Sequence, residues 1–172
     1  MSNQWFLDQA RLGNMFHASS AGAVTLSTVS TTCTGLALSN TVGSNKLLVV
    51  ESVSFTPSTA PAGAAVVGLA IHTAISSTNT THTTPMVVHN AICNGSDTSS
   101  AGKADAAATL ASTPLWLRPM ASVVAASSIT PAKYKDDTNG SIIIRPGGCL
   151  SLSYLTPAAV GIASITWVEV DE

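Results

Sequence analysis

The stretch Ser141-Ile-Ile-Ile-Arg-Pro-Gly-Gly-Cys-Leu-Ser-Leu-Ser-Tyr154, followed closely by Gly161-Ile-Ala-Ser-Ile-Thr-Trp-Val-Glu-Val170, decides the fold class. A β-branched run ends at a Pro-Gly-Gly turn, and two segments then alternate between apolar and small polar side chains. Because side chains along a strand point alternately to opposite faces, Leu150, Leu152 and Tyr154 share one face, and the intervening serines share the other. This pattern predicts three strands of a β-sandwich.

Similar segments recur along the rest of the chain at intervals of roughly 8 to 15 residues, which is typical of antiparallel sandwiches and barrels. We therefore expect an all-β protein, an antiparallel two-sheet sandwich of the jelly-roll type with about eight to ten strands. Glu51 lies among apolar residues, which predicts a bulge or a satisfied structural carboxylate, because an unpaired buried carboxylate is costly. The polar segments 75–84 and 127–139 are predicted loops, and 104–110 is either helix or strand.

Residues 1–20 differ in composition from the rest and are predicted to form an N-terminal arm, with residues 21–172 as a single sandwich domain. Gly13 and Asn14 interrupt the helical periodicity of the arm, so we expect a short arm instead of a stable helix. An exposed aromatic cluster is a liability, so the arm is expected to dock on its own sandwich or on a neighbouring subunit. The predicted interaction residues of the arm are Trp5, Phe6, Leu7, Leu12 and Phe16.

The composition points to assembly. Charged residues make up 9% of the chain and hydrophobic types 45%, whereas about 25% of residues are charged in a typical soluble domain. Short neutral side chains offer little repulsion between copies and lose little rotamer entropy when they are immobilised, which favours packed subunit interfaces. The alternative is a stable monomer with an unremarkable β surface.

Charge and hydropathy exclude several classes of partner. With a net charge of −2 and no basic run, the chain has no electrostatic footprint for nucleic acid. The longest apolar stretch, 62–71, is much shorter than the ~20 residues of a membrane-spanning helix, so no membrane partner is expected. Cys33, Cys93 and Cys149 are odd in number and far apart, which indicates buried thiols acting as small hydrophobes.

The residues with chemical potential form no convincing catalytic set. His72, His82 and His89 are close in sequence but have no neighbouring carboxylate, so we expect hydrogen-bonding histidines at a surface or between subunits, with no metal and no cofactor. The chain lacks a Gly-x-Ser-x-Gly elbow. Asp136 and Asp137 are adjacent in a segment with lysines, which indicates a solvated turn, not a glycosidase pair. The sequence therefore predicts no enzyme and no catalytic residue.

These features together resemble the small structural proteins of tailed-bacteriophage virions, including head decoration or cement proteins. The likeness is carried by the aromatic arm Trp5–Phe16, the Ala/Thr/Val strands, the Arg145–Gly148 turn and the terminal Gly161–Val170 strand. The resemblance implies a jelly-roll homotrimer, made in the host cytoplasm, that sits on the major capsid protein at the capsid surface and reinforces the shell.

Two alternatives stay open at this stage. Tail fibre and spike heads share this composition, so the same features also suit a virion tail. A carbohydrate-binding or adhesin sandwich is the competing class, because Trp116 and Tyr134 are candidate platform residues for a glycan.

Overall fold

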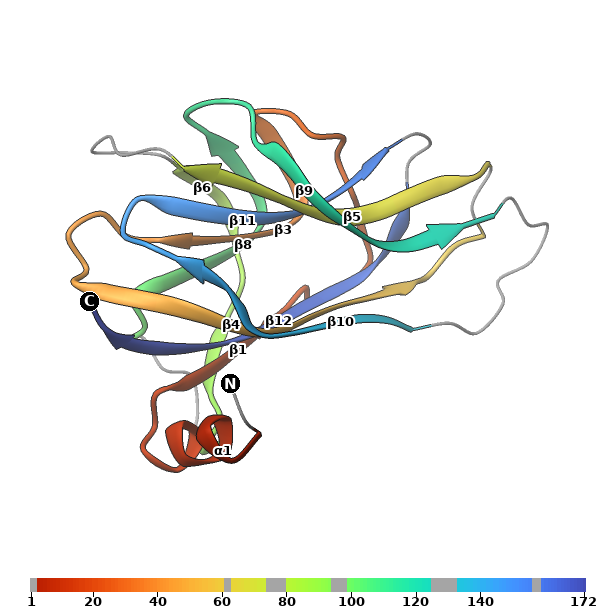
Figure 1. The fold of residues 1–172 in the computed structure, drawn as a ribbon. Coiled ribbons are helices and arrows are strands. Elements are labelled where there is room, and N and C mark those ends of the chain that lie inside the picture. The colour runs from red at the N-terminus through yellow and green to blue at the C-terminus, as the bar shows by residue number, and fades with distance from the viewer. Residues whose placement is uncertain (1–2, 61–62, 74–79, 94–98, 125–132, 156–158) are drawn as a thin grey trace.

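The computed structural model describes residues 3–60, 63–73, 80–93, 99–124, 133–155 and 159–172. These residues form one helix and twelve strands (Figure 1). In chain order the elements are α1 (Asn3–Arg11), β1 (Met15–Ser19), β2 (Val24–Thr25), β3 (Thr32–Asn40), β4 (Lys46–Pro57), β5 (Ala65–Thr73), β6 (Thr80–Pro85), β7 (Val88–Asn90), β8 (Gly102–Leu110), β9 (Leu115–Val123), β10 (Tyr134–Ile144), β11 (Gly148–Leu155) and β12 (Val160–Asp171).

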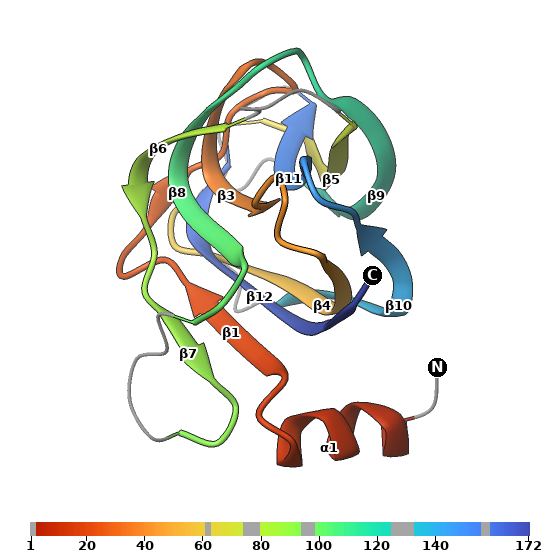
Figure 2. The ribbon, with the colours of Figure 1, turned by 90° about the vertical axis from the view of Figure 1, so that its left-hand side faces the viewer.

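The strands pair antiparallel in two sheets packed face to face, which confirms the predicted all-β sandwich (Figure 2). Sheet A has the order β10-β4-β12-β1-β7, with β2 paired to β12, and sheet B has the order β6-β8-β3-β11-β5-β9. The pairs β6–β8, β5–β9, β4–β10 and β3–β11 nest inside one another along the chain. However, β6 and β8 extend sheet B beside β3 and do not join β4 and β10 in sheet A. The jelly-roll form therefore stays a prediction.

The stretch that predicted the fold behaves as expected. After β10, the Gly148 N–H donates to the Arg145 carbonyl at 2.8 Å, which closes a tight turn. Gly147 adopts the φ of 85° that the third position of a type II turn requires, after a proline at the second. On β11, Leu150 and Leu152 are buried in the core between the sheets.

The core is built on the predicted alternation of β12. Ala163, Ile165 and Trp167 face the opposite sheet and are at most 2% exposed. The ring of Phe16 on β1 stacks on Trp167 with centroids 6.0 Å apart. At the bulge opposite Thr166 and Trp167, Glu51 is the unpaired residue of β4, so of the two alternatives for Glu51, a bulge or a satisfied structural carboxylate, the structure shows the bulge.

The expectation of an arm without a stable helix is wrong. Residues Asn3–Arg11 form α1, and Gly13 follows it with a left-handed φ of 78°. The Gly13 N–H donates to the Ala10 carbonyl at 3.1 Å, and the Asn14 N–H donates to the Gln9 carbonyl at 3.0 Å. These two bonds form a Schellman motif, so the glycine that looked like a helix breaker is the residue that ends the helix cleanly.

The first residues pack on the chain's own body. Phe6 is 5% exposed and contacts Val49 and Val168 on the outer face of sheet A. The sequence left two docking surfaces open for the arm, its own sandwich and a neighbouring subunit, and the structure shows it packed on its own sandwich. The boundary expected after residue 20 falls between β1 and β2, and β1 lies inside sheet A between β12 and β7.

Two segments predicted as loops contain strands. Thr80–Pro85 forms β6 at one edge of sheet B, and β10 begins at Tyr134. Both are edge strands, where polar side chains on the open side are compatible with pairing. On β10, Lys135 and Asp137 form an ion pair, so the polar residues mark a solvent-facing strand surface. The ambiguous segment 104–110 lies within β8. No helix in the described ranges is long and apolar enough to span a bilayer.

Candidate functional site

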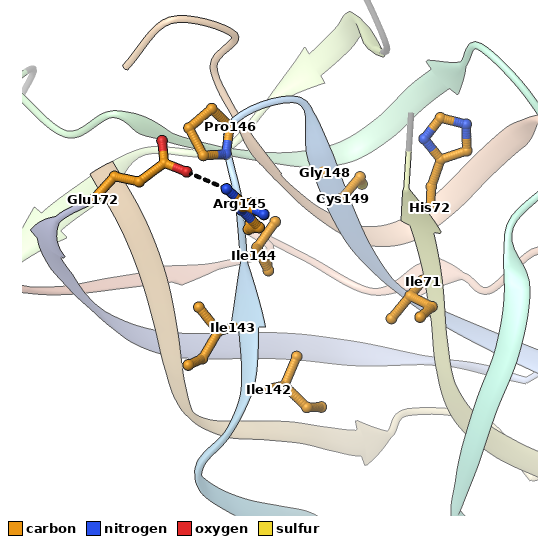
Figure 3. A pocket seen from close by; sticks show the side chains of 10 residues that line it. All are labelled: Ile71, His72, Ile142, Ile143, Ile144, Arg145, Pro146, Gly148, Cys149 and Glu172. Atoms are coloured by element: carbon orange, nitrogen blue, oxygen red, sulfur yellow. Dashed lines mark hydrogen bonds and ion pairs between the residues drawn. The ribbon is translucent and has the colours of Figure 1, made fainter. Parts of the chain in front are cut away.

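A groove of 590 Å³ opens at one edge of the sandwich, between β5 of sheet B and β10 of sheet A (Figure 3). Its lining is mostly apolar, with Ile71 on β5 and Ile142 and Ile144 on β10, and the β10–β11 turn forms one wall. Arg145 and Glu172 also line it, and the Arg145 Nη2 lies 2.7 Å from the Glu172 Oε1. An apolar hollow with a few polar groups is the usual form of a contact or ligand site.

Exposed aliphatic side chains lie on the two strands beside this groove. Ile143 lines the groove and is 48% exposed, while Leu115, the register partner of Ile71, is 67% exposed. Leu117, also on β9, is 40% exposed. Strands β9 and β10 are edge strands of their sheets. We call the groove with Ile143, Leu115 and Leu117 the β9–β10 edge. Single exposed leucines are ordinary, but several around one apolar groove mark a contact surface.

Arg118 and Asp136 fasten the two edge strands to each other. The Arg118 Nε donates to one carboxylate oxygen of Asp136 and Nη2 donates to the other, each at 2.9 Å. This two-point geometry is the strong form of an arginine–carboxylate pair. Asp136 therefore lies on a strand and ties sheet A to sheet B, and the predicted solvated turn at Asp136 and Asp137 is wrong.

The predicted arm residues divide into two groups. Phe6 and Phe16 are buried in the chain's own packing, and Trp5 is partly buried beside Phe6, with ring centroids 4.9 Å apart. Leu7 and Leu12 stay exposed. The aromatic side chains therefore support the fold. Contact between the arm and a partner stays a prediction, and the exposed side chains of Leu7 and Leu12 are available for it.

The three predicted histidines lie on β5, β6 and β7 and have separate surroundings. In the part of the chain that the structure describes, no three His, Cys, Asp or Glu side chains gather as metal ligands. His72 is 3% exposed, and its Nε2 accepts the Ser112 N–H at 3.0 Å, so the ring proton of the neutral form sits on Nδ1. Burial lowers the pKa of His72, which keeps this ring neutral.

His82 is paired with a buried carboxylate that the sequence analysis overlooked. Asp105 on β8 is 1% exposed, and its Oδ2 lies 2.6 Å from the His82 Nδ1. Among the described residues, the other oxygen of Asp105 has no hydrogen-bond partner. Burial raises the pKa of Asp105, and the contact with His82 opposes that shift. The pair resembles the acid–histidine half of a catalytic triad. A triad also needs a nucleophile, and the cysteine thiols near Asp105 are candidates for that role.

The thiols beside Asp105 are inert. Cys33 and Cys149 are buried together with Ala37, Ala108 and Leu110. Burial raises the pKa of Cys33 to about 11 and raises that of Cys149 well above its usual value. A nucleophilic cysteine needs a lowered pKa, because the thiolate is the reactive form. These two cysteines are small hydrophobes, as the sequence predicted, whereas Cys93 is exposed, contrary to that prediction.

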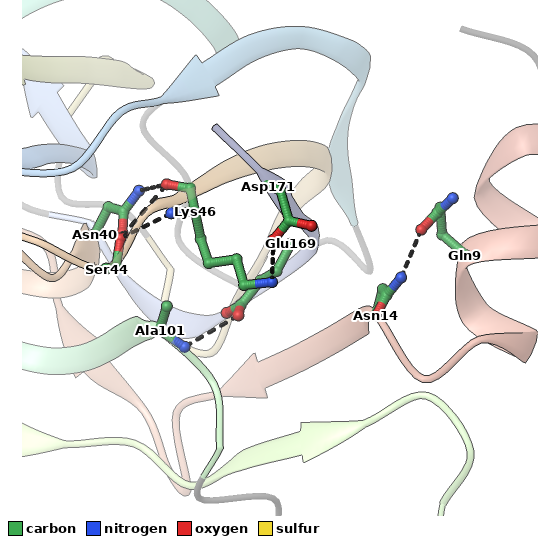
Figure 4. A network of polar contacts seen from close by, with 8 residues as sticks. All are labelled: Gln9, Asn14, Asn40, Ser44, Lys46, Ala101, Glu169 and Asp171. Carbon is green, nitrogen blue, oxygen red and sulfur yellow. Dashed lines mark hydrogen bonds and ion pairs between the residues drawn. The ribbon is translucent and has the colours of Figure 1, made fainter.

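Glu169 accepts hydrogen bonds from several buried donors at the end of β12, and Figure 4 shows the bond from the Ala101 N–H. One carboxylate oxygen accepts from the Ser100 hydroxyl at 2.6 Å, the Gly102 N–H at 3.0 Å and the Trp167 indole at 3.1 Å. The other accepts from the Ala101 N–H at 3.0 Å. This carboxylate therefore anchors the start of β8, in sheet B, to β12, in sheet A.

The candidate glycan residues point to different sides of the sandwich. A Cβ added to Gly68 would lie 2.7 Å from the Trp116 ring, on the outer face of sheet B, because neighbouring Val67 and Leu69 face the core. Tyr134 instead packs against the core. The two rings do not share one platform, and glycan binding by either stays a prediction.

Comparison with known proteins adds no further constraint. A scan of protein-family models, a search of curated proteins and a search of solved structures each found no match.

Proposed function

We propose that the chain is a structural assembly protein, a virion component that decorates and stabilises a capsid shell as a homotrimer. The observation that carries the proposal is the β9–β10 edge, where an apolar groove lined by Ile143 lies beside strand β9, which pairs with β5 and carries the exposed Leu115 and Leu117. A lone chain leaves these side chains in water, and contact with a neighbour removes them from it.

A stable contact needs only a small part of the surface of the chain. A specific interface buries about 800 Å² on each partner, roughly a tenth of the 7985 Å² that the chain exposes. Fully burying a leucine or isoleucine contributes about 1.5–3 kcal/mol, and these three are already partly covered, so together they supply about 2–4 kcal/mol. On a shell with many identical positions, modest contacts of this size add up through effective concentration.

The native mass of the chain tests the trimer, and Leu115→Glu tests the surface. We expect three times the chain mass for the wild type, and the single-chain mass for the variant, because a carboxylate would be desolvated in the interface. Val42→Glu is the matched control, since Val42 is exposed on the β3–β4 connection. Lone wild-type chains up to near-millimolar concentration would refute the trimer, and a trimeric Leu115→Glu variant would refute the edge as its contact.

The virion role has its own test. Peptide mass spectrometry of purified particles, produced from the genome that encodes the chain, should detect it in a fixed ratio to the major capsid protein. Labelled chain should then bind to particles stripped of it. Particles that lack the chain would refute the virion assignment whatever its native mass, and labelling of the tail alone would place it on a fibre or spike.

A further inference from the structure

The outer face of sheet A brings together two histidines that are far apart in the sequence. Strands β1 and β7 are antiparallel neighbours, and His17 lies directly opposite His89 in their register. Phe16 and Ala18 on either side of His17 are buried in the core, and Val88 packs against the core, so both imidazoles project from the other face. Directly opposite residues have Cβ atoms about 4.5–5.5 Å apart, within reach of one shared ion.

The ring of His17 is held by a third strand. Its Nδ1 lies 2.9 Å from the hydroxyl oxygen of Thr166 on β12. When Nδ1–H donates to that oxygen, the lone pair of Nε2 is left free for a ligand. A hydrogen bond of this kind on the second ring nitrogen is the usual way in which a metal-binding histidine is oriented. The ring of His89 is exposed and makes no hydrogen bond within the described residues.

The surroundings favour a cation. The carboxylate of Glu51, at the bulge of β4, acts electrostatically on the His17 ring. The Glu51 carboxylate therefore adds a negative potential that attracts a cation, and the proposed site does not require it as a ligand.

We propose that His17 and His89 form a two-histidine site for a borderline transition cation of the Zn²⁺ or Ni²⁺ class. Imidazole nitrogens suit these ions, whereas Mg²⁺ and Ca²⁺ prefer oxygen ligands. Zinc–nitrogen bonds are about 2.0–2.1 Å long, so the site requires both rings to turn toward one ion, with water as the remaining ligands. The bound ion cross-links β7, which among the described strands is hydrogen-bonded only to β1, to the body of sheet A.

This inference is independent of the proposed assembly role. Strands β7 and β10 are opposite ends of sheet A, so the histidine pair lies away from the β9–β10 edge. Loss of one function by mutation therefore leaves the other to be measured.

Thermal unfolding of a chain without an affinity tag, with ZnCl₂, NiCl₂ or MgCl₂, tests the site. At a hundredfold excess of free Zn²⁺ over its Kd, we expect the Tm to rise by about 5–10 °C, and we expect no rise with MgCl₂. Cys93→Ser is the background for every measurement, because that exposed thiol also binds soft metals. Calorimetric titration should give one ion per chain.

His89→Ala is the decisive variant, since its side chain is exposed and its loss leaves the core intact. His89→Ala should lower the Zn²⁺ affinity by more than about tenfold, because the loss of a direct ligand weakens binding at least as much as the loss of an outer-shell partner. His17→Ala should have the same effect. His82→Ala, which removes another exposed strand histidine, should retain the response. An unchanged response in His89→Ala, or no binding at millimolar Zn²⁺ in the Cys93→Ser background, refutes the site.

Discussion

Replacing Glu169 by alanine tests how the two sheets are joined. The carboxylate is 7% exposed and accepts four hydrogen bonds. Its removal leaves an indole N–H and two backbone N–H groups without acceptors, while the Ser100 hydroxyl keeps the Gly102 carbonyl at 2.9 Å. Each unsatisfied buried donor costs about 1–3 kcal/mol. Because water enters the space that the side chain leaves, we expect a total loss of about 3–5 kcal/mol.

Glu169→Gln separates the charge from the shape. The glutamine oxygen keeps the three bonds now made by Oε1, but its amide group faces the Ala101 N–H, so a donor meets a donor. Loss of one charge-assisted hydrogen bond corresponds to about 1.5–3 kcal/mol. Glu172→Ala is the control, because its ion pair with Arg145 is exposed at the surface and such pairs contribute about 0–1 kcal/mol.

Equilibrium unfolding in urea, followed by tryptophan fluorescence, measures these differences as shifts in midpoint at constant slope. The expected order of loss is Glu169→Ala, then Glu169→Gln, then Glu172→Ala. A Glu169→Ala variant within about 1 kcal/mol of the wild type would refute the argument that unsatisfied donors dominate. An equal loss of unfolding free energy in Glu172→Ala and Glu169→Ala would also refute it.

The other predictions concern the thiols, a buried acid and an interstrand pair. Ellman's reagent should react quickly with Cys93 in the native chain and with Cys33 and Cys149 only after unfolding; three fast thiols in the native chain would contradict their burial. Burial raises the pKa of Asp105 in the folded state, so its ionisation costs stability as pH rises above the unfolded value. In urea unfolding, Asp105→Asn should therefore gain stability relative to the wild type as the pH rises above about 4, the ordinary aspartate pKa, and a stability difference that does not change with pH would count against this. Arg118→Lys loses the two-point contact with its carboxylate on β10 and should lower the unfolding free energy by about 0.5–1.5 kcal/mol in the same assay, whereas no change would show that the pair adds nothing.

The last third of the chain was predictable because its information is local. The Pro-Gly-Gly turn and the strict alternation around Leu150, Leu152 and Trp167 identify strands and their buried faces without knowledge of their partners. The helix was missed for the opposite reason. In the sequence pattern Gly13 indicates an interruption, but its place immediately after the last helical turn makes it the residue that ends the helix, and the backbone hydrogen bonds distinguish these two roles.

The polar sites depend on pairings between distant segments. His89 was grouped with its sequence neighbours, yet its partner His17 is fixed by the register of β1 against β7. The donors to Glu169 come from the start of β8 and the residues just before it, which nothing near Glu169 in the sequence indicates. Asp105 did carry a signal, because a single carboxylate in an alanine-rich run has to be either solvated or paired, and β8 lies between β6 and β3.

The central position of β12 has a consequence for synthesis on the ribosome. His17 and Thr166, which touch in the folded chain, are 149 residues apart in sequence, and pairings at such long range make folding slow. The N-terminal segment emerges early, whereas β12, which pairs with β1 and carries the Trp167 ring that stacks on Phe16, is made about 150 residues later. We therefore expect a nascent chain that stalls before residue 160 to leave the Phe16 ring without the indole on which it packs in the folded protein.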